Sequence, residues 1–170
     1  RVERCLATVE RLAKYHGNLY NWYDTETTDT LKPEFVSTVD SGNFVCCLVA
    51  LGEGLADYAG EHRPLTALQG RIRAIVDATD LAPFYDRRKN LFSIGWNVPE
   101  ETLVDSHYDF LMSEARLTSY FAVARKTVSR RHWGAMGRAM SRTGSYAGPV
   151  SWTGTMFEYF MPHLLLPVYE

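Results

Sequence analysis

Apolar residues recur every three or four positions in five stretches of this 170-residue chain, and this spacing constrains the fold more than any other feature. The interval matches the 3.6-residue turn of an α-helix and therefore predicts amphipathic helices. The first is expected from about Arg1 to Tyr15. The second has an apolar face from Phe44 to Leu55, and the third begins near Pro64, since proline is favoured in the first turn of a helix.

The other two helices are predicted in the second half of the chain. One follows Ser106 and extends to about Lys126, and the other starts around Ser151 and meets Pro162, which must kink it or begin a new turn. Residues 81–104 lack a helical period, and LFSIGWNV within them is either a short strand or an extended loop. GRAMSRTGSYAGPVS is predicted to be a Gly/Ser loop. The sequence therefore predicts an all-α fold with long loops, which build a cleft at one end of the helices, and little strand.

Composition and motifs exclude several classes of protein. Apolar residues make up 46% of the chain, and the formal charge is −2 without an extended basic block, so nucleic-acid binding has little support. Neither the three cysteines nor the histidines show metal-ligand spacing, so no metal or cofactor is predicted. The chain has no phosphate loop, dinucleotide fingerprint or nucleophile elbow. It also has no uninterrupted apolar run of about 18 residues, the length that predicts a membrane span.

Glu114 is the leading candidate for a catalytic residue. It lies in HYDFLMSEARLTSYF, three residues after Leu111 and three before Leu117, which places it inside the apolar stripe of the fourth predicted helix. A carboxyl group taken out of water has a raised pKa, as a general acid near neutral pH requires. The alternative is a structural ion pair with Arg116 or with an arginine of another helix.

Three other carboxylates have both a functional and a structural interpretation. Glu158, in TMFEYFMP, is a candidate for catalysis or substrate binding, or equally for a buried bridge that orients another helix. Asp40, in VSTVDSGN, either points into a cleft or caps the helix that follows. Asp24 lies between aromatic residues in NWYDT, where a carboxylate can bind sugar hydroxyls.

Four aromatic residues in loops or at a helix start are candidate platforms for stacking on a sugar: Trp22, Tyr23, Trp96 and Trp152. Most aromatic side chains simply fill a core, so each alone is a weak signal. Together with the carboxylates they suit glycosyl chemistry, in which two carboxyl groups flank the scissile bond.

Six motifs occur in a fixed order along the chain: LYNWYDT, VSTVDSGN, NLFSIGWN, the SEARL run, RHW and VSWTGTMFEYFMP. In order and spacing they resemble the central glycoside-hydrolase-like (glucoamylase-like) region of bacterial cyclic β-1,2-glucan synthases, from about His16 to the end of the chain. The resemblance implies that residues 1–170 are a fragment of one α/α-toroid domain, a barrel of six helical hairpins. It also implies a large parent protein with further domains, at the cytoplasmic face of the bacterial inner membrane.

The same resemblance implies a function. In these synthases the region is expected to cut linear β-1,2-glucan and rejoin it into a ring by transglycosylation, with Glu114 as acid/base and the other candidate residues binding or supporting the glucan. The second catalytic carboxylate is expected outside these 170 residues, so the isolated chain is expected to be inactive. Two alternatives stay open: a hydrolytic endo-β-1,2-glucanase and a non-catalytic helical module that binds glycan or acts as a scaffold.

Overall fold

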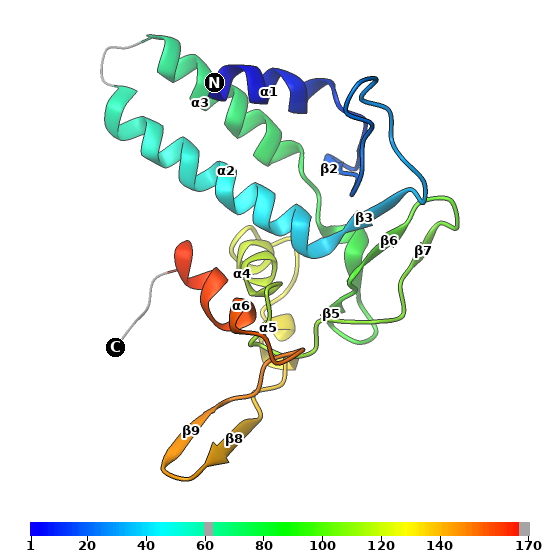
Figure 1. Cartoon of the computed structure of the whole chain (residues 1–170), viewed down its shortest axis with the longest axis vertical. Helices are drawn as coiled ribbons and strands as arrows, with labels where there is room; N and C mark the ends of the chain where they lie inside the picture. Colours follow the sequence, from blue (N-terminus) through cyan, green and yellow to red (C-terminus); the bar gives the residue numbers. More distant parts are fainter. Residues whose placement is uncertain (60–62, 167–170) are drawn as a thin grey trace.

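A computed structural model describes residues 1–59 and 63–166 (Figure 1). It contains 45% helix and 20% strand, and the strands form several small antiparallel sheets. The prediction of an all-α fold, and with it that of a partial α/α toroid, is therefore wrong. The protein has a mixed α/β composition in which short strands occupy what the periodicity suggested were loops.

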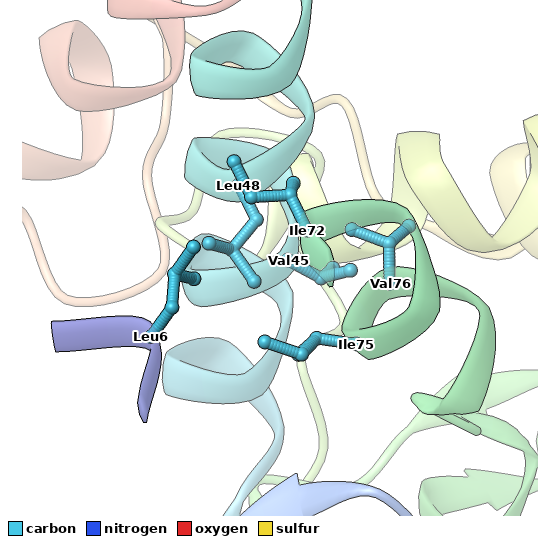
Figure 2. Close-up of a cluster of buried hydrophobic side chains, with 6 residues drawn as sticks. All are labelled: Leu6, Val45, Leu48, Ile72, Ile75 and Val76. Carbon is cyan, nitrogen blue, oxygen red and sulfur yellow. The ribbon is translucent and has the colours of Figure 1, made fainter. Parts of the chain in front are cut away.

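Three helices pack together in the N-terminal half: α1 (Val2–Arg11), α2 (Thr38–Ala59) and α3 (Arg63–Ala78). As Figure 1 shows, α2 and α3 lie side by side along their length, and α1 lies next to α3. A cluster of buried aliphatic side chains joins them (Figure 2), namely Leu6, Val45, Leu48, Ile72, Ile75 and Val76. These residues belong to the predicted apolar faces, so three helices are confirmed in these regions. The first is shorter than predicted, because it ends at Arg11 and Lys14 and Tyr15 belong to a short strand.

Helix α2 begins earlier than the sequence suggested. It starts at Thr38, so Asp40 lies within its first turn and does not precede it as the cap. The window Thr38–Tyr58 has a mean hydropathy of 1.3 and is long and apolar enough to cross a membrane by length and composition alone. The core helix of a soluble protein meets the same test, and α2 packs against both α3 and α4 (Arg116–Ala124).

The strands form one three-stranded and three two-stranded antiparallel sheets within the described residues. The three-stranded sheet has the order β3 (Phe35–Ser37), β6 (Gly95–Asn97), β7 (Thr102–Leu103). The pairs are β1 (Lys14–Tyr15) with β2 (Asn18–Leu19), β4 (Tyr85–Asp86) with β5 (Leu91–Phe92), and β8 (Met140–Thr143) with β9 (Tyr146–Pro149). LFSIGWNV thus contributes β5 and β6, as the strand alternative for that segment expected.

The predicted Gly/Ser loop at residues 137–151 is instead a hairpin. Thr143 pairs with Tyr146 across the two-residue connection Gly144-Ser145, and Gly144 has φ +62°. A glycine at the first position of a two-residue loop is typical of turns that match the twist of a hairpin. Strands of two to four residues are too short for an alternating pattern to emerge, which is why periodicity missed them.

The C-terminal half has shorter helices than predicted. The fourth predicted helix is reduced to α4, and the fifth to α6 (Met156–Phe160) followed by a 3₁₀ turn, η2 (Met161–Leu164). Pro162 falls in the first turn of η2, so it begins a new turn as anticipated. The other elements are α5 (Arg131–Ala135) and the 3₁₀ helix η1 (Ala82–Phe84).

Helices α2 and α4 cross in unusually close contact. A Cβ atom at Gly42 would overlap the side chain of Thr118, whose hydroxyl donates a hydrogen bond of 3.3 Å to the carbonyl of Thr38. Only a residue without a side chain fits this position on α2. The crossing therefore fixes the first turn of α2 against the start of α4.

Candidate active site

Glu114 lies in a turn directly before α4 and not on a long helix. The Arg116 N–H donates to the Ser113 carbonyl at 3.2 Å, and Met112 forms a parallel bridge with Ser151. The predicted helix is interrupted here because residues 107–112 pair with strand-like segments elsewhere in the chain. The prediction that Glu114 lies within the apolar stripe of a helix is therefore wrong, although its side chain is half-buried.

The alternative prediction is an ion pair between Glu114 and an arginine, and among the described residues no arginine forms one with Glu114. The Arg116 guanidinium is buried and points elsewhere: it lies 3.0 Å from the Met112 sulfur, 3.3 Å from the Tyr159 carbonyl and 3.5 Å from His163 Nε2. Burial lowers the pKa of Arg116. Glu114 is thus left without an arginine to stabilise its charge.

Two other carboxylates act on Glu114. Burial raises the pKa of Glu114, and the negative charges of Asp40 and then Glu158 raise it further. A carboxylate close to like charges holds its proton to higher pH, because ionisation would add another negative charge to the same small region. The arrangement brings together three of the carboxylates singled out in the sequence and favours Glu114 as their proton donor.

Glu158 is only 3% exposed and its carboxylate caps α6. Its oxygens accept hydrogen bonds from the Thr153 N–H at 2.9 and 3.1 Å and from the Thr155 N–H at 3.1 Å, while Thr155 Oγ1 accepts from the Glu158 N–H. Burial alone would raise the pKa of Glu158, but hydrogen bonds led by that from Ser151 hold it below its usual range. Glu158 is therefore a fixed negative charge beside Glu114.

Asp40 is the exposed member of the three. It lines a cavity of about 170 Å³ together with residues of β2 and of the aromatic loop that follows, among them Asn18, Tyr20 and Asn21. Asn18 is buried and its Oδ1 has no hydrogen-bond partner. Asp40 thus places a solvent-facing carboxylate at a small recess of mixed polar and apolar lining.

Trp152 borders the carboxylates from the C-terminal side. Its ring lies 4.9 Å from that of Tyr108 at an interplanar angle of 49°, and its Nε1 donates to the His107 carbonyl at 3.1 Å. Tyr108 in turn packs with Val39 and Ala115. These are the residues adjacent in sequence to Asp40 and Glu114, so an aromatic pair lies at the base of the cluster.

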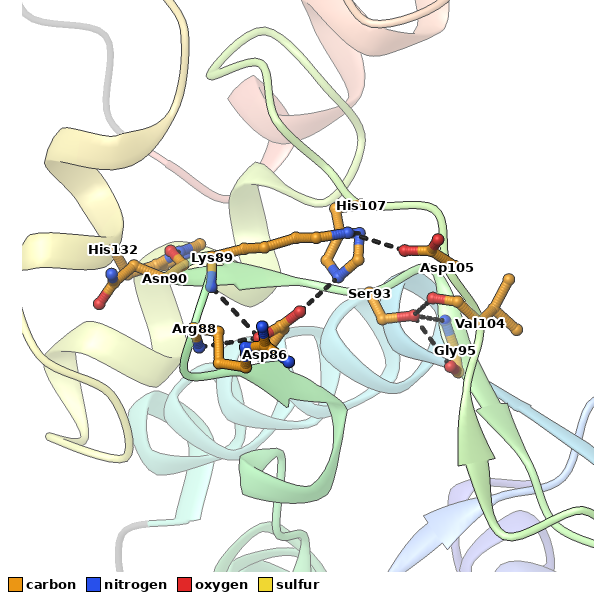
Figure 3. Close-up of polar contacts among 10 residues, drawn as sticks. All are labelled: Asp86, Arg88, Lys89, Asn90, Ser93, Gly95, Val104, Asp105, His107 and His132. Atoms are coloured by element: carbon orange, nitrogen blue, oxygen red, sulfur yellow. Dashed lines mark hydrogen bonds and ion pairs between the residues drawn. The ribbon is translucent and has the colours of Figure 1, made fainter.

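A polar network, drawn in Figure 3, holds the backbone that carries Tyr108. His107 Nε2 lies 3.3 Å from Asp86 Oδ2, an ion-pair distance without hydrogen-bond alignment. Lys89 Nζ lies 2.7 Å from Asp105 Oδ1 and 3.3 Å from His107 Nδ1. Ser93 donates to the Val104 carbonyl at 2.6 Å, which ties this segment to β6.

The other four predicted binding residues make contacts elsewhere, and none of their contacts among the described residues reaches this cluster. Asp24 Oδ1 accepts the N–H groups of Glu26 and Thr27, and these bonds lower its pKa. The Tyr23 hydroxyl donates to the Ala13 carbonyl at 2.6 Å. Trp96, in β6, stacks on Tyr15 at 5.8 Å, and Trp22 is 47% exposed in the loop before β3. The sugar-binding roles of these four stay predictions.

Sequence reasoning missed three residues of the cluster: Tyr108, Ser113 and Ser151. All three are buried, and the Ser113 hydroxyl has no hydrogen-bond partner. Ser113 and Ser151 lie next to the candidate residues Glu114 and Trp152, but nothing in the spacing of the three distinguishes them. Across residues 1–59 and 63–166, no group of three or more potential ligands could hold a metal ion.

No known protein-family profile matches the chain. The chain is 24% identical to the cyclic beta-(1,2)-glucan synthase NdvB of Rhizobium meliloti over 98% of its length. The aligned region spans 288 residues, more than the chain contains, so NdvB has intervening segments that this chain lacks. The chain spans about 10% of the length of NdvB. The comparison confirms the relation to cyclic β-1,2-glucan synthases.

Proposed function

We propose that this chain is part of an enzyme that cuts linear β-1,2-glucan and rejoins it into a ring by transglycosylation, with Glu114 as the acid/base. The observation that carries the proposal is the position of Glu114: a half-buried carboxyl group beside Asp40 and Glu158, with a raised pKa and no arginine partner among the described residues. A carboxyl group that holds its proton near neutral pH can protonate a glycosidic oxygen.

The reaction proceeds in two displacements. Glu114 donates its proton to the glycosidic oxygen while a carboxylate nucleophile attacks the anomeric carbon, and the bond to the leaving sugar breaks as the glycosyl-enzyme bond forms. Glu114, now ionised, takes the proton from a sugar 2-hydroxyl, whose oxygen attacks the anomeric carbon and releases the nucleophile. A ring forms when this hydroxyl belongs to the other end of the same glucan.

The nucleophile is assigned outside these 170 residues. Glu158 is unsuited to that role, because its two oxygens accept three backbone hydrogen bonds that orient α6. Asp40 is assigned to substrate binding, and its negative charge helps to raise the pKa of Glu114. The remaining parts of a longer protein at the cytoplasmic face of the inner membrane would supply the second carboxylate and further glucan contacts.

Product analysis tests the proposal. The complete protein that carries this chain is incubated with linear β-1,2-glucan, and the products are weighed by mass spectrometry, in which a ring lacks one water relative to the linear glucan of the same length. We expect rings with the wild type and a loss of about 10²–10⁴-fold with Glu114→Gln, the range for removal of a general acid. Glu100→Gln, at an exposed carboxylate, is the matched control and should retain wild-type rates.

Each alternative has its own outcome. Short linear products that depend on Glu114 would show a hydrolase, in which water replaces the sugar acceptor. Rings formed at the normal rate by Glu114→Gln would refute the assignment of Glu114. Binding of glucan without any product would identify a non-catalytic module.

A further inference from the structure

Tyr108 lies where the three segments that carry the carboxylates meet. Its ring packs with Val39, Ala115 and Trp152. Val39 precedes Asp40, Ala115 follows Glu114, and Trp152 precedes Thr153, whose N–H donates to the Glu158 carboxylate. One aromatic side chain is therefore in contact with the residues next to Asp40 and Glu114, and with the segment whose backbone is bonded to Glu158.

The ring is held firmly. Tyr108 is 4% exposed, and its N–H donates to the Phe92 carbonyl at 2.9 Å. The tilted contact with Trp152 fixes one face, and Trp152 is itself anchored to the carbonyl of His107. A side chain held from several sides presents its hydroxyl at a defined position, which is the preorganisation that ligand recognition requires.

The hydroxyl has no bond of its own within the part of the chain that the structure describes. The side chain is only 4% exposed, so this hydroxyl lies in a largely buried position. A phenylalanine would fill the same space without leaving a donor unpaired in a largely buried position, where such a group carries a desolvation penalty. Packing accounts for the ring, but it does not account for the hydroxyl.

The surroundings also determine the protonation state of the Tyr108 hydroxyl. Burial raises the pKa of Tyr108 far above its usual range, and the charges of Glu114, Asp40 and Glu158 raise it further. The phenol therefore stays protonated throughout the physiological range and can donate a hydrogen bond. A sugar oxygen held among acidic groups needs such a neutral donor, since the carboxylates themselves supply mainly acceptors.

We propose that Tyr108 is a substrate-binding residue whose hydroxyl donates a hydrogen bond to an oxygen of the glucosyl unit held between Glu114 and Asp40. This inference rests on the proposed function and adds a residue that the motifs did not single out. Tyr108 orients the sugar while Glu114 acts on its glycosidic oxygen.

Calorimetric titration of the complete protein that carries this chain with linear β-1,2-glucan tests the proposal through Tyr108→Phe, which removes one oxygen and keeps the packing. We expect the dissociation constant to rise roughly tenfold, the effect of one hydrogen bond to a ligand. The melting temperature should not fall, because no intramolecular bond is lost and an unpaired buried donor is removed. Tyr85→Phe is the matched control: its hydroxyl is also unpaired and buried, but it lies beside His132 and should leave the affinity as it is.

The outcomes separate the two proposals. Wild-type affinity in Tyr108→Phe would overturn the role of Tyr108 while leaving the assignment to glucan intact. An equal loss of affinity in Tyr85→Phe would overturn it too, because the effect would not be local to the site. Absence of glucan binding by the wild type would refute the proposed function, and the role of Tyr108 with it.

Discussion

Replacement of Gly42 by alanine should disrupt the crossing of α2 and α4 that places Asp40 near Glu114. The added Cβ would overlap Thr118, which is fully buried and cannot swing aside into solvent. Overpacking of this kind costs about 1–3 kcal/mol. Loss of the Thr118–Thr38 hydrogen bond adds about 0.5–1.5 kcal/mol.

The helix itself partly offsets this cost, because alanine is better than glycine within a helix by about 0.5–1 kcal/mol. We therefore expect a net destabilisation of about 2 kcal/mol, or a fall in melting temperature of about 4–8 °C for a chain of this size. Urea unfolding followed by circular dichroism measures the free energy of unfolding. Gly54→Ala is the control on the same helix: nothing lies within 4 Å of its added Cβ, so it should be neutral or stabilising.

A Gly42→Ala variant as stable as Gly54→Ala would refute the reasoning. It would mean that α4 does not approach α2 at Thr118 and that the relative position of Asp40 and Glu114 has some other origin. A destabilised Gly42→Ala variant that recovers when Thr118 is also reduced to alanine would locate the conflict at this contact.

Three further predictions concern the site and the surface. The pKa of Glu114 is raised from 4.5 in the folded state, so the contribution of Glu114 to the free energy of unfolding is complete below pH 4.5 and is lost as the pH rises through the folded pKa. Glu114→Gln should therefore stabilise the protein in thermal unfolding at pH 7 but not at pH 4. Thr155→Ala removes the cap of α6 and should cost about 0.5–2 kcal/mol in urea unfolding, whereas the exposed Thr25→Ala should be neutral. Phe157 and Phe160 are exposed apolar residues on α6, so the chain should self-associate in sedimentation velocity and the double serine variant should do so less; a wild type that stays monomeric at all concentrations would contradict this.

The N-terminal helices could be predicted because their burial follows the helical period. Val45, Leu48, Ile72 and Val76 lie at spacings of three and four residues and all fall in one core cluster. The same rule failed for Glu114. Leu111 and Leu117 flank it at helical spacing, but the backbone from His107 to Met112 forms bridges to distant segments, and no local pattern reports such long-range pairing.

The candidate site was predictable in its residues but not in its geometry. The motifs identified Asp40, Glu114 and Glu158, which the fold brings together from α2, the turn before α4 and α6. Tyr108 was missed because its importance comes only from what packs around it. Asp24 and Tyr23 were selected for their types, yet the structure shows them bonded to neighbouring backbone groups.

The most direct test of the central claim is an NMR titration of the Glu114 side-chain carboxyl group. The account predicts a midpoint above 4.5 that moves down when Asp40 is replaced by asparagine, because a neighbouring negative charge is removed. A midpoint at or below 4.5 that does not respond to Asp40→Asn would contradict it, since Glu114 would then be an ordinary ionised carboxylate with no proton to donate.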